Sequence, residues 1–277
     1  MKTNPPVDTS FWDRNRGTIR SRKGGWKIGE AVYCHGYNML EEFIGHKSYF
    51  QVLILNATGR LVERRIADWF EAIFISMSWP DPRIWCNQIG ALGGTMRTSI
   101  VAATTAGLLA ADSRNYAQRT LAGGCQFISS ALNAIKTGLS AEEFVLQQTA
   151  KTGISPNFMG YSRPVAKGDE RVPAMERVSK DLKFPEGEHL TLAYEIEKVL
   201  LQRYDEAMNL TGYASAFLCD QGFTGEEICR IGTIIVNSGV TACYTDTIER
   251  PAGAFLPMRC EDIDYQGPPP RAVPDRR

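Results

Sequence analysis

Apolar residues recur at helical spacing along most of the chain. In residues 60–77 the apolar stripe consists of Leu61, Ile66, Trp69, Phe70, Ile73 and Phe74. In residues 186–208 it consists of Leu190, Ala193, Ile196, Leu200 and Tyr204. Side chains three and four positions apart share one face of an α-helix, so each stretch is predicted to be a helix with one buried face.

The same spacing predicts further helices, separated by short breaks. They cover residues 38–45, 48–57, 84–92, 95–111, 117–136, 141–151, 173–182, 213–221 and 226–244. Pro80 and Pro82 end the helix of residues 60–77, because a proline restricts its own backbone and that of the residue before it. Gly93 and Gly94 are expected to separate or bend the helices on either side of them.

Two of the predicted helices have a clear start signal. Ser140 with Glu143, and Thr224 with Glu227, have the spacing of a capping box, in which each residue binds the backbone N–H of the other. Strand-like sequence is confined to residues 18–37, which predict a small hairpin or arm. The predicted fold class is therefore all-α, with a short N-terminal β-hairpin or arm.

The composition is that of a globular protein, and it limits the classes of partner that can be expected. Apolar residues make up 43% of the sequence, and 31 lysines and arginines balance 31 aspartates and glutamates. No nucleic-acid partner is expected, because a nucleic-acid-binding protein shows a basic surface. No membrane partner is expected either, because the longest uncharged apolar segment, residues 98–111, is too short to span a bilayer and no secretory pattern follows Met1.

Cysteines and histidines give no sign of a metal. The seven cysteines are an odd number, scattered and without a Cys-x-x-Cys pair, which favours reduced thiols in a cytoplasmic protein. None of His35, His46 and His189 has metal-ligand spacing to another histidine or cysteine. The chain also lacks Gly-x-Ser-x-Gly, a phosphate-binding P-loop and a dinucleotide fingerprint, which disfavours nucleophilic serine chemistry and nucleotide hydrolysis. No bound cofactor is expected.

Candidate chemistry concentrates in the loop of residues 157–171, with the sequence NFMGYSRPVAKGDER. Gly160 permits close backbone approach or a positive φ. Arg163, Lys167 and Arg171 add three cations. A loop of this composition is typical of an anion-binding site, and a solvated surface turn is the alternative interpretation.

Two other breaks between predicted helices are rich in polar groups, residues 112–116 and 209–213. If these breaks meet the loop, a single pocket holds Arg114 together with the three cations of the loop. Clusters of arginine and lysine bind carboxylates and phosphates, so such a pocket predicts an anionic small-molecule ligand.

The three breaks, in this order, resemble the active-site segments of the citrate synthase superfamily, and most closely its short members, the citryl-CoA lyases and the corresponding module of ATP-citrate lyase. SIVAATTAGLLAADSRNYA resembles the helix that leads into the family's Gly-x-x-His-Gly-Gly. GYSRPVAKGDER resembles Gly-Phe-Gly-His-Pro-x-Tyr-Lys-x-x-Asp-Pro-Arg. NLTGYASAFLCDQGF resembles Asn-Ile-Asp-Gly followed by an apolar helix and Leu-Gly-Phe. The similarity covers approximately residues 30–267.

The resemblance implies an all-α fold of two domains and a homodimer whose cleft binds an acyl-CoA and a carboxylic acid. It implies a large domain of residues 1–117 and 236–277 and a small domain of residues 118–235. A coenzyme A thioester is then expected as a substrate and not as a bound cofactor. In the family, one histidine polarises the acyl-CoA carbonyl, an aspartate removes the α-proton, and a second histidine acts on the partner carbonyl.

All three of those catalytic positions differ in this sequence. The first histidine matches Arg114, the second matches Arg163, and the aspartate matches Thr211. An arginine stays protonated at any working pH and a threonine hydroxyl is no base without a helper, so the family's proton transfer cannot use these side chains. The arginine of the family's Asp-Pro-Arg persists as Arg171, preceded by Glu170 in place of the proline.

The first hypothesis is an enzyme with a rebuilt, arginine-rich active site that makes or breaks a C–C bond. Its predicted catalytic residues are Arg114, Arg163, Thr211, Asp112, Tyr116 and Tyr161, with Cys243 as a further candidate for proton transfer. The residues predicted to bind the substrate or coenzyme A are Gly160, Ser162, Lys167, Arg171 and Asn209.

The second hypothesis is a catalytically silent homologue that binds an anionic ligand or has a regulatory or structural role. The two histidine positions hold arginines, whereas simple loss of function would leave a small residue such as alanine or glycine. This replacement favours the enzyme hypothesis. Finding Arg114 and Arg163 turned outward, or locked in salt bridges, would favour the silent homologue. A third interpretation is a purely architectural resemblance in which the loops serve packing.

Overall fold

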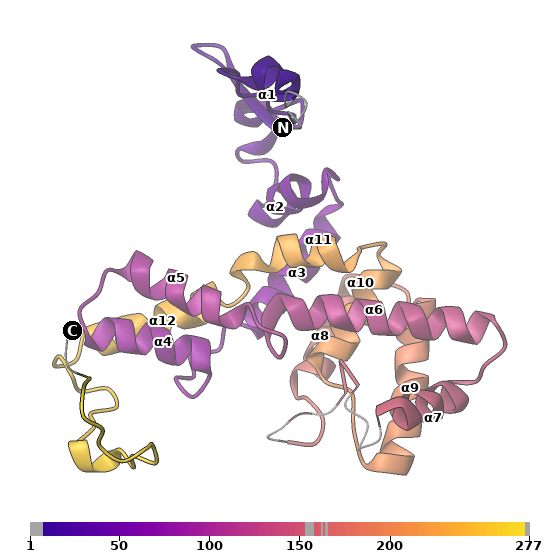
Figure 1. Cartoon of the computed structure of the whole chain (residues 1–277). Coiled ribbons are helices and arrows are strands. Elements are labelled where there is room, and N and C mark those ends of the chain that lie inside the picture. Colours follow the sequence, from indigo (N-terminus) through magenta and orange to yellow (C-terminus); the bar gives the residue numbers. More distant parts are fainter. Residues whose placement is uncertain (1–7, 153–157, 162, 164–165, 275–277) are drawn as a thin grey trace, which may run out of the picture. The chain divides into compact units, whose positions relative to one another are not determined.

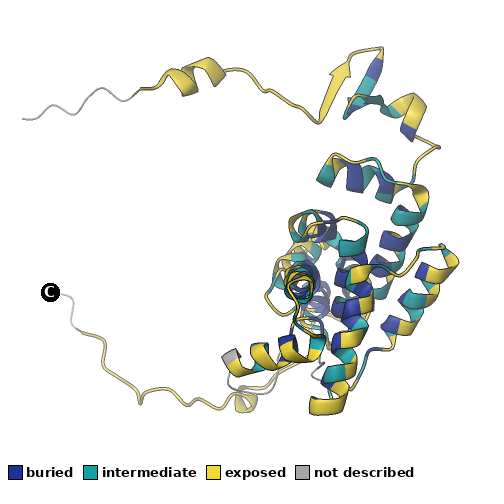
Figure 2. Cartoon of the chain, turned by 90° about the vertical axis from the view of Figure 1, so that its right-hand side faces the viewer, coloured by how far each residue is buried: buried dark blue, intermediate teal, exposed yellow. Residues whose placement is uncertain are grey.

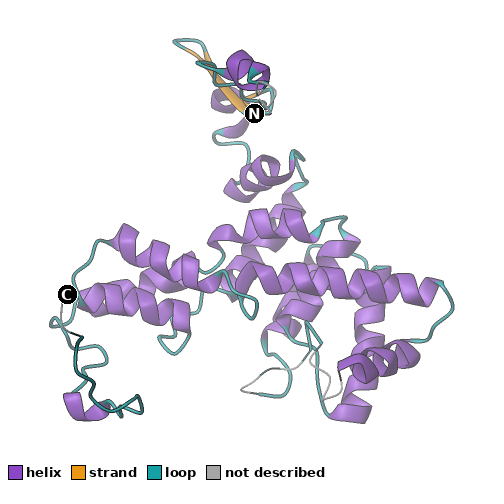
Figure 3. Ribbon diagram, in the orientation of Figure 1, coloured by secondary structure: helices purple, strands orange, loops and turns teal. Residues whose placement is uncertain are grey.

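The computed structural model describes residues 8–152, 158–161, 163 and 166–274 (Figure 1). Helices make up most of these residues, beginning with α1 (Ser10–Asn15). The described strands are β1 (Gly24–Lys27), β2 (Ala31–Cys34) and β3 (Tyr37–Asn38), which form one antiparallel sheet in the order β1-β2-β3 (Figure 3). The predicted all-α class with a short N-terminal hairpin is therefore confirmed.

The chain divides into two compact units. Unit 1 comprises residues 1–76 and 114–233, and unit 2 comprises residues 77–113 and 234–277. Two unit boundaries lie close to the expected domain boundaries at residues 117 and 236, whereas residues 1–76 group with the middle of the chain. The expected division into a large and a small domain stays a prediction.

Unit 1 contains the sheet, the π-helical turn η1 and eight of the described α-helices besides α1. After η1 (Met39–Phe43) these are α2 (Tyr49–Thr58), α3 (Arg64–Ser76), α6 (Ala117–Lys136), α7 (Ala141–Thr152), α8 (Arg171–Asp181), α9 (Glu188–Tyr204), α10 (Leu210–Asp220) and α11 (Gly225–Ile231). Figure 2 shows the buried residues on the helix faces that meet their neighbours. The predicted stripe of α9 is buried at Leu190, Ala193, Ile196 and Leu200, as expected.

The apolar stripe of α3 forms the centre of the unit 1 core. Its buried members are Ala67, Trp69, Phe70, Ile73 and Phe74. The Trp69 ring is fully enclosed and stacks on Phe217, with ring centroids 4.2 Å apart. Trp69 Nε1 donates a hydrogen bond to Ser179 Oγ at 2.9 Å. The predicted helical face is therefore confirmed, and α3 is tied to α8 and α10 through one tryptophan.

Several helices begin at other residues than the apolar pattern predicted. The helix expected over residues 95–111 begins at Ile100, where the Ser99 side chain caps it, and the one expected over residues 173–182 begins at Arg171. Residues 38–45 form the end of β3 and the π-helical turn η1 in place of the expected helix.

The starts of α3 and α10 also differ, each for a local reason. Helix α3 begins at Arg64, because Gly59 ends α2 at a φ of 82° and Arg60 turns its guanidinium over the Phe223 ring at 4.4 Å. Helix α10 begins at Leu210 and not at residue 213, because the Asn209 side chain caps it. Asn209 was expected to interrupt a helix, and it instead starts one.

The prediction of one helix over residues 226–244 is wrong. Helix α11 ends at Ile231, a 3₁₀ turn η2 (Gly232–Ile234) follows, and α12 (Asn237–Ile248) belongs to unit 2. A Cβ on Gly232 would lie 2.7 Å from the Gln118 Cβ, so a close approach to α6 needs glycine where α11 ends. The capping box predicted for α11 is confirmed, with Thr224 Oγ1 accepting from the Glu227 N–H at 3.2 Å.

Unit 2 is built on α4 (Trp85–Thr95), α5 (Ile100–Ala111) and α12, followed by a short turn η3 (Cys260–Asp262). The prediction of a helix break at Gly93 and Gly94 is wrong, because α4 continues through both to Thr95. A Cβ on Gly94 would overlap Thr247 Oγ1 of α12, and one on Gly93 would overlap the Ala103 Cβ of α5. These glycines permit close helix packing and do not end the helix.

Helix α6 positions the candidate site within unit 1. It matches its predicted bounds and packs against α9, α10 and α11 (Figure 1). A Cβ on Gly124 would lie 2.9 Å from the Ser215 Cβ, so α6 and α10 approach closely at this point. No helix in the described part of the chain is long and apolar enough to cross a membrane.

Candidate functional site

The structure brings the loop before α8 against the start of α10. The Asn209 N–H donates to the Gly160 carbonyl at 2.9 Å, and Tyr161 pairs with Met208 in an isolated antiparallel bridge. Gly160 has a φ of 98°, and a Cβ there would lie 2.6 Å from the Gly212 Cα. Two of the three predicted polar segments therefore touch through their backbones, and Gly160 is required for that contact. Ser162, a predicted ligand-binding residue, lies outside the described residues.

Asp169 fastens this loop to α10. Its side chain is completely buried and accepts hydrogen bonds from Arg171 Nε at 2.8 Å and Nη2 at 2.7 Å. It also accepts from the Leu210 N–H at 3.0 Å, in the first turn of α10. Burial alone would raise the pKa of Asp169, but the hydrogen bonds and charge of Arg171, with the Leu210 N–H, hold it below the ordinary value.

The other two cations of the loop are also paired with acids of the same chain. The Arg163 side chain is only 18% exposed, and its two terminal nitrogens lie 2.5 and 3.2 Å from the carboxylate oxygens of Glu170. Arg163 Nη1 lies 3.7 Å from a carboxylate oxygen of Asp169. Lys167 forms an ion pair with Asp205. In the loop that was predicted to hold an anion, each of the three cations is therefore bound by a carboxylate.

The first turns of α6 and α10 lie side by side. Thr120 Oγ1 of α6 and Thr211 Oγ1 of α10 are 3.2 Å apart and share a hydrogen bond. Residues 114–116 lead directly into α6. Arg114 is exposed and forms no hydrogen bond or ion pair with the described residues, and Tyr116 is half-buried. The joining of Arg114, Arg163 and Thr211 in one cleft stays a prediction.

The structure narrows the candidates for proton transfer. The Tyr161 hydroxyl is buried and donates to the Ala193 carbonyl at 2.9 Å, and burial with the nearby Glu197 charge raises its pKa. Burial also raises the pKa of Cys243, which lies in α12 of unit 2. Neither group ionises near neutral pH. Asp112, assigned to unit 2, is exposed.

Sequence reasoning missed a histidine that a carboxylate orients. His189 lies in the first turn of α9, and its Nδ1 is 2.9 Å from an oxygen of Asp220 at the end of α10. Asp220 also accepts the N–H groups of His189 and Leu190, at 2.9 and 3.0 Å. The two residues are 31 positions apart, so no local pattern could reveal the pair.

In the described part of the chain, no three His, Cys, Asp or Glu residues lie close enough together to bind a metal ion.

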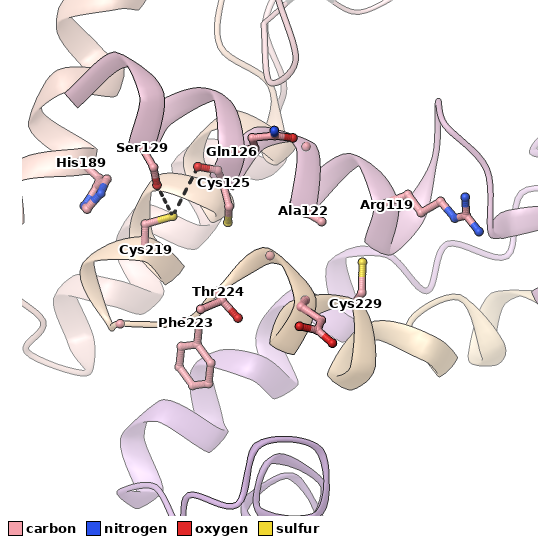
Figure 4. A pocket seen from close by; sticks show the side chains of 14 residues that line it. Arg119, Ala122, Cys125, Gln126, Ser129, His189, Cys219, Phe223, Thr224 and Cys229 are labelled. Atoms are coloured by element: carbon pink, nitrogen blue, oxygen red, sulfur yellow. Dashed lines mark hydrogen bonds between the residues drawn. The ribbon is translucent and has the colours of Figure 1, made fainter. Parts of the chain in front are cut away.

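Sequence reasoning also missed an open pocket of about 810 Å³ in unit 1 (Figure 4). It lies between α6 and the segment that joins α10 to α11, and it contains His189 and three of the cysteines. None of the described residues predicted for the site lines this pocket. The cavity is therefore separate from the segments that carried the predicted chemistry.

No protein-family profile matches the chain, and no curated protein matches it in sequence. Solved structures do match. Citryl-CoA lyase from Hydrogenobacter thermophilus has a TM-score of 0.77 and 21% identity, over 92% of this chain and 97% of that one. ATP citrate lyase from Methanothrix soehngenii, in complex with citrate and coenzyme A, has a TM-score of 0.75 and 17% identity, over 96% of this chain and 45% of that one.

A citrate synthase from Thermotoga maritima matches at a TM-score of 0.60 and 18% identity, over 82% of this chain and 60% of that one. At these identities the likeness is one of fold. It agrees with the resemblance of the three segments and extends over nearly the whole chain. The chain has the citrate synthase fold.

Proposed function

We propose that this protein binds an anionic ligand, an acyl-CoA or a carboxylic acid, beside the first turns of α6 and α10, without the enolising chemistry of citrate synthases. The observation that carries the proposal is the pairing of Arg163 with Glu170 and Asp169. The resemblance puts a catalytic histidine at this position, whereas the guanidinium here is neutralised by carboxylates. Its pKa is raised by Glu170, so it stays charged and transfers no proton.

Two further features support a ligand at this place. Arg114 offers an exposed guanidinium with no partner among the described residues, directly before α6. The N–H groups of a helix's first turn attract anions, and the first turn of α6 lies beside α10 at Thr120 and Thr211. The donors would come from α6, because the first N–H groups of α10 already donate to Asp169 and Asn209. A likeness of fold to an ATP citrate lyase that holds citrate and coenzyme A favours these ligand classes.

Replacing Arg114 by alanine is expected to abolish ligand binding and leave stability unchanged, because the side chain is exposed and has no partner among the described residues. The measurement is thermal unfolding with coenzyme A, acetyl-CoA, citrate and citryl-CoA. A ligand at roughly 100 times its dissociation constant should stabilise the wild type by about 2.7 kcal/mol. Arg83→Ala, which removes an arginine with a 90% exposed side chain, is the control and should keep the response. No stabilisation of the wild type by any of these ligands would contradict the proposal.

The second candidate is a lyase or synthase with a rebuilt site, and the exposed Arg114 favours it. A guanidinium that no carboxylate neutralises can stabilise an oxyanion that develops on a thioester carbonyl. The proton would then pass through Asp112 or Tyr116. Release of coenzyme A from citryl-CoA, or from acetyl-CoA with oxaloacetate, separates the two candidates. Turnover that disappears in Arg114→Ala would establish the enzyme, and binding without turnover would establish the silent homologue.

We also infer a homodimer, which an exposed face of α5 supports. Val101 and Leu109 are 71% and 72% exposed, and Thr105 between them is exposed on the same side. Unburied apolar side chains in one row are typical of a surface that another helix covers. The occupant that the resemblance implies is a second copy of the chain.

Introducing charge on this face is expected to yield a monomer. The double substitution Val101→Asp and Leu109→Asp places two carboxylates in the inferred interface, and burying an unpaired charge is strongly unfavourable. Light scattering after gel filtration should give twice the chain mass for the wild type and one chain mass for the variant. Leu201→Asp, at a partly exposed leucine of α9, is the control. A wild-type monomer, or a variant that stays dimeric, would show that this face is free.

A further inference from the structure

Two arginines and two acids meet where the loop before α8 ends. Arg171 binds Asp169, and Arg163 binds Glu170. Arg163 Nη1 also lies 3.7 Å from a carboxylate oxygen of Asp169, and Asp169 accepts from the Leu210 N–H in the first turn of α10. The Arg163 guanidinium is therefore linked through a single carboxylate to the place where we propose that an anionic ligand binds.

The two acids of this cluster are held with different firmness. The Asp169 side chain is completely buried and accepts hydrogen bonds from Arg171 and from the Leu210 N–H. The Glu170 side chain is 59% exposed, and its two oxygens lie 2.5 and 3.2 Å from the terminal nitrogens of Arg163. An exposed carboxylate that leaves an arginine regains water, so such a pair is easily exchanged. Glu170 can be replaced at the guanidinium, whereas Asp169 stays in place.

The charges of the cluster match one exchangeable carboxylate. Arg163 and Arg171 carry two positive charges, Asp169 carries one fixed negative charge, and Glu170 supplies the second. A ligand carboxylate has the same single charge and the same two oxygens, so it fits the guanidinium as Glu170 does. A dianionic phosphate would bring an additional negative charge close to Asp169, and like charges repel each other.

We propose that Arg163 binds a carboxylate of the ligand and that Glu170 competes for the same guanidinium, so that Glu170 sets the affinity and the selectivity of the site. The inference rests on the proposed function, because it concerns the same site. The resemblance places a proline at position 170, and a proline has no carboxylate with which to compete.

The competition also selects among carboxylic acids. A ligand with a single carboxylate only exchanges one ion pair of Arg163 for another and gains little. A di- or tricarboxylate offers a further carboxylate to another cation, such as the exposed Arg114. The site should therefore discriminate against monocarboxylates, because discrimination depends on the difference between two binding free energies.

The experiment measures the dissociation constant of citrate by isothermal titration calorimetry with the full-length protein. Glu170→Gln keeps the size of the side chain and removes its charge, and it should bind citrate about five-fold more tightly than the wild type. This factor corresponds to about 1 kcal/mol, the upper end for exposed ion pairs. The gain for inorganic phosphate should be smaller. Glu142→Gln is the matched control, because the Glu142 side chain is 51% exposed and also pairs with an arginine, Arg203; it should leave the constant unchanged.

A second substitution shows whether the gain passes through Arg163. In an Arg163→Gln protein, adding Glu170→Gln should give no gain, because the contested guanidinium is absent. Arg163→Lys, which keeps the charge and loses the two-pronged geometry, serves if Arg163→Gln does not fold by circular dichroism.

The outcomes separate this inference from the proposed function. Equal citrate affinity of the wild type and Glu170→Gln, with binding that Arg114→Ala abolishes, would overturn the competition and leave the proposed function standing. An equal gain in Glu142→Gln, or a gain that persists in Arg163→Gln, would also overturn it. Absence of citrate binding in the wild type and in Glu170→Gln would overturn the inference, and the proposed function would fall with it only if coenzyme A and acetyl-CoA also gave no response.

Discussion

Asp169→Asn is expected to lower the free energy of unfolding by about 3 kcal/mol, the lower end of the range for breaking a buried ion pair. The Asp169 carboxylate is completely buried and binds both Arg171 and the Leu210 N–H. An asparagine keeps the size of the side chain but removes the charge and turns an amide N–H₂ toward one of these donors. Arg171 is 20% exposed and can regain water, so the loss should lie at the lower end. Chemical denaturation followed by circular dichroism measures the change.

A nearby acid gives the matched control for this substitution. Glu170→Gln removes the partner of Arg163, but the Glu170 side chain is 59% exposed, so the loss should be about 0–1 kcal/mol, as for surface ion pairs. Equal losses in the two variants would contradict the assignment of Asp169 as the group that fastens the loop to α10.

The pH dependence of the same variant gives an independent check. The pKa of Asp169 is lowered in the folded protein, so its stabilisation is fully present above the ordinary value of 3.8 and is lost as the pH falls through the lowered folded value. The difference in unfolding free energy between wild type and Asp169→Asn should therefore be constant near neutral pH and shrink below pH 3.8. A difference that persists in strong acid would mean that packing, and not charge, is lost.

Local pattern was sufficient to predict most of the helices, and the starts of those that begin with a capping box. The stripe of α3, the bounds of α6 and the box at Thr224 follow from spacing alone, because they depend on residues within a few positions. Gly94 shows where spacing is insufficient. A glycine inside a helix either ends the helix or permits a neighbouring helix to approach closely. At Gly94 the second role applies, because a Cβ there would overlap Thr247 of α12.

The sequence was sufficient to predict which segments form the candidate site, but not which side chains pair with one another there. The contact of the loop with α10 agrees with the resemblance, which brought both segments to one site. The bond between Arg163 and Glu170 depends on how the loop turns back on itself, and the sequence shows only that cations and acids alternate there. The pairing of His189 with Asp220 depends on the packing of α9 against α10, which no local pattern encodes.

Trp69→Ala is expected to cost about 3–5 kcal/mol of unfolding free energy, the usual range for removing a large aromatic side chain from a core. Trp69 is completely buried, stacks on Phe217 at 4.2 Å and donates to Ser179 Oγ. The substitution leaves a cavity among α3, α8 and α10, which can collapse only in part. Ser179 Oγ keeps the hydrogen bond from the Tyr213 hydroxyl at 2.8 Å, so no buried acceptor is orphaned and the cavity accounts for most of the loss. The measurement is denaturant unfolding followed by circular dichroism.

Two further variants separate the cavity from the hydrogen bond. Trp69→Phe keeps an aromatic ring beside Phe217 and loses the N–H donor, so its cost should be clearly smaller than that of Trp69→Ala. Trp12→Ala makes the alanine change at a tryptophan of α1 that is 67% exposed, and it should change stability by less than about 0.5 kcal/mol. If Trp69→Phe were as costly as Trp69→Ala, the bond to Ser179 would carry the stability of this core. If Trp12→Ala were as costly as Trp69→Ala, burial would not be the cause.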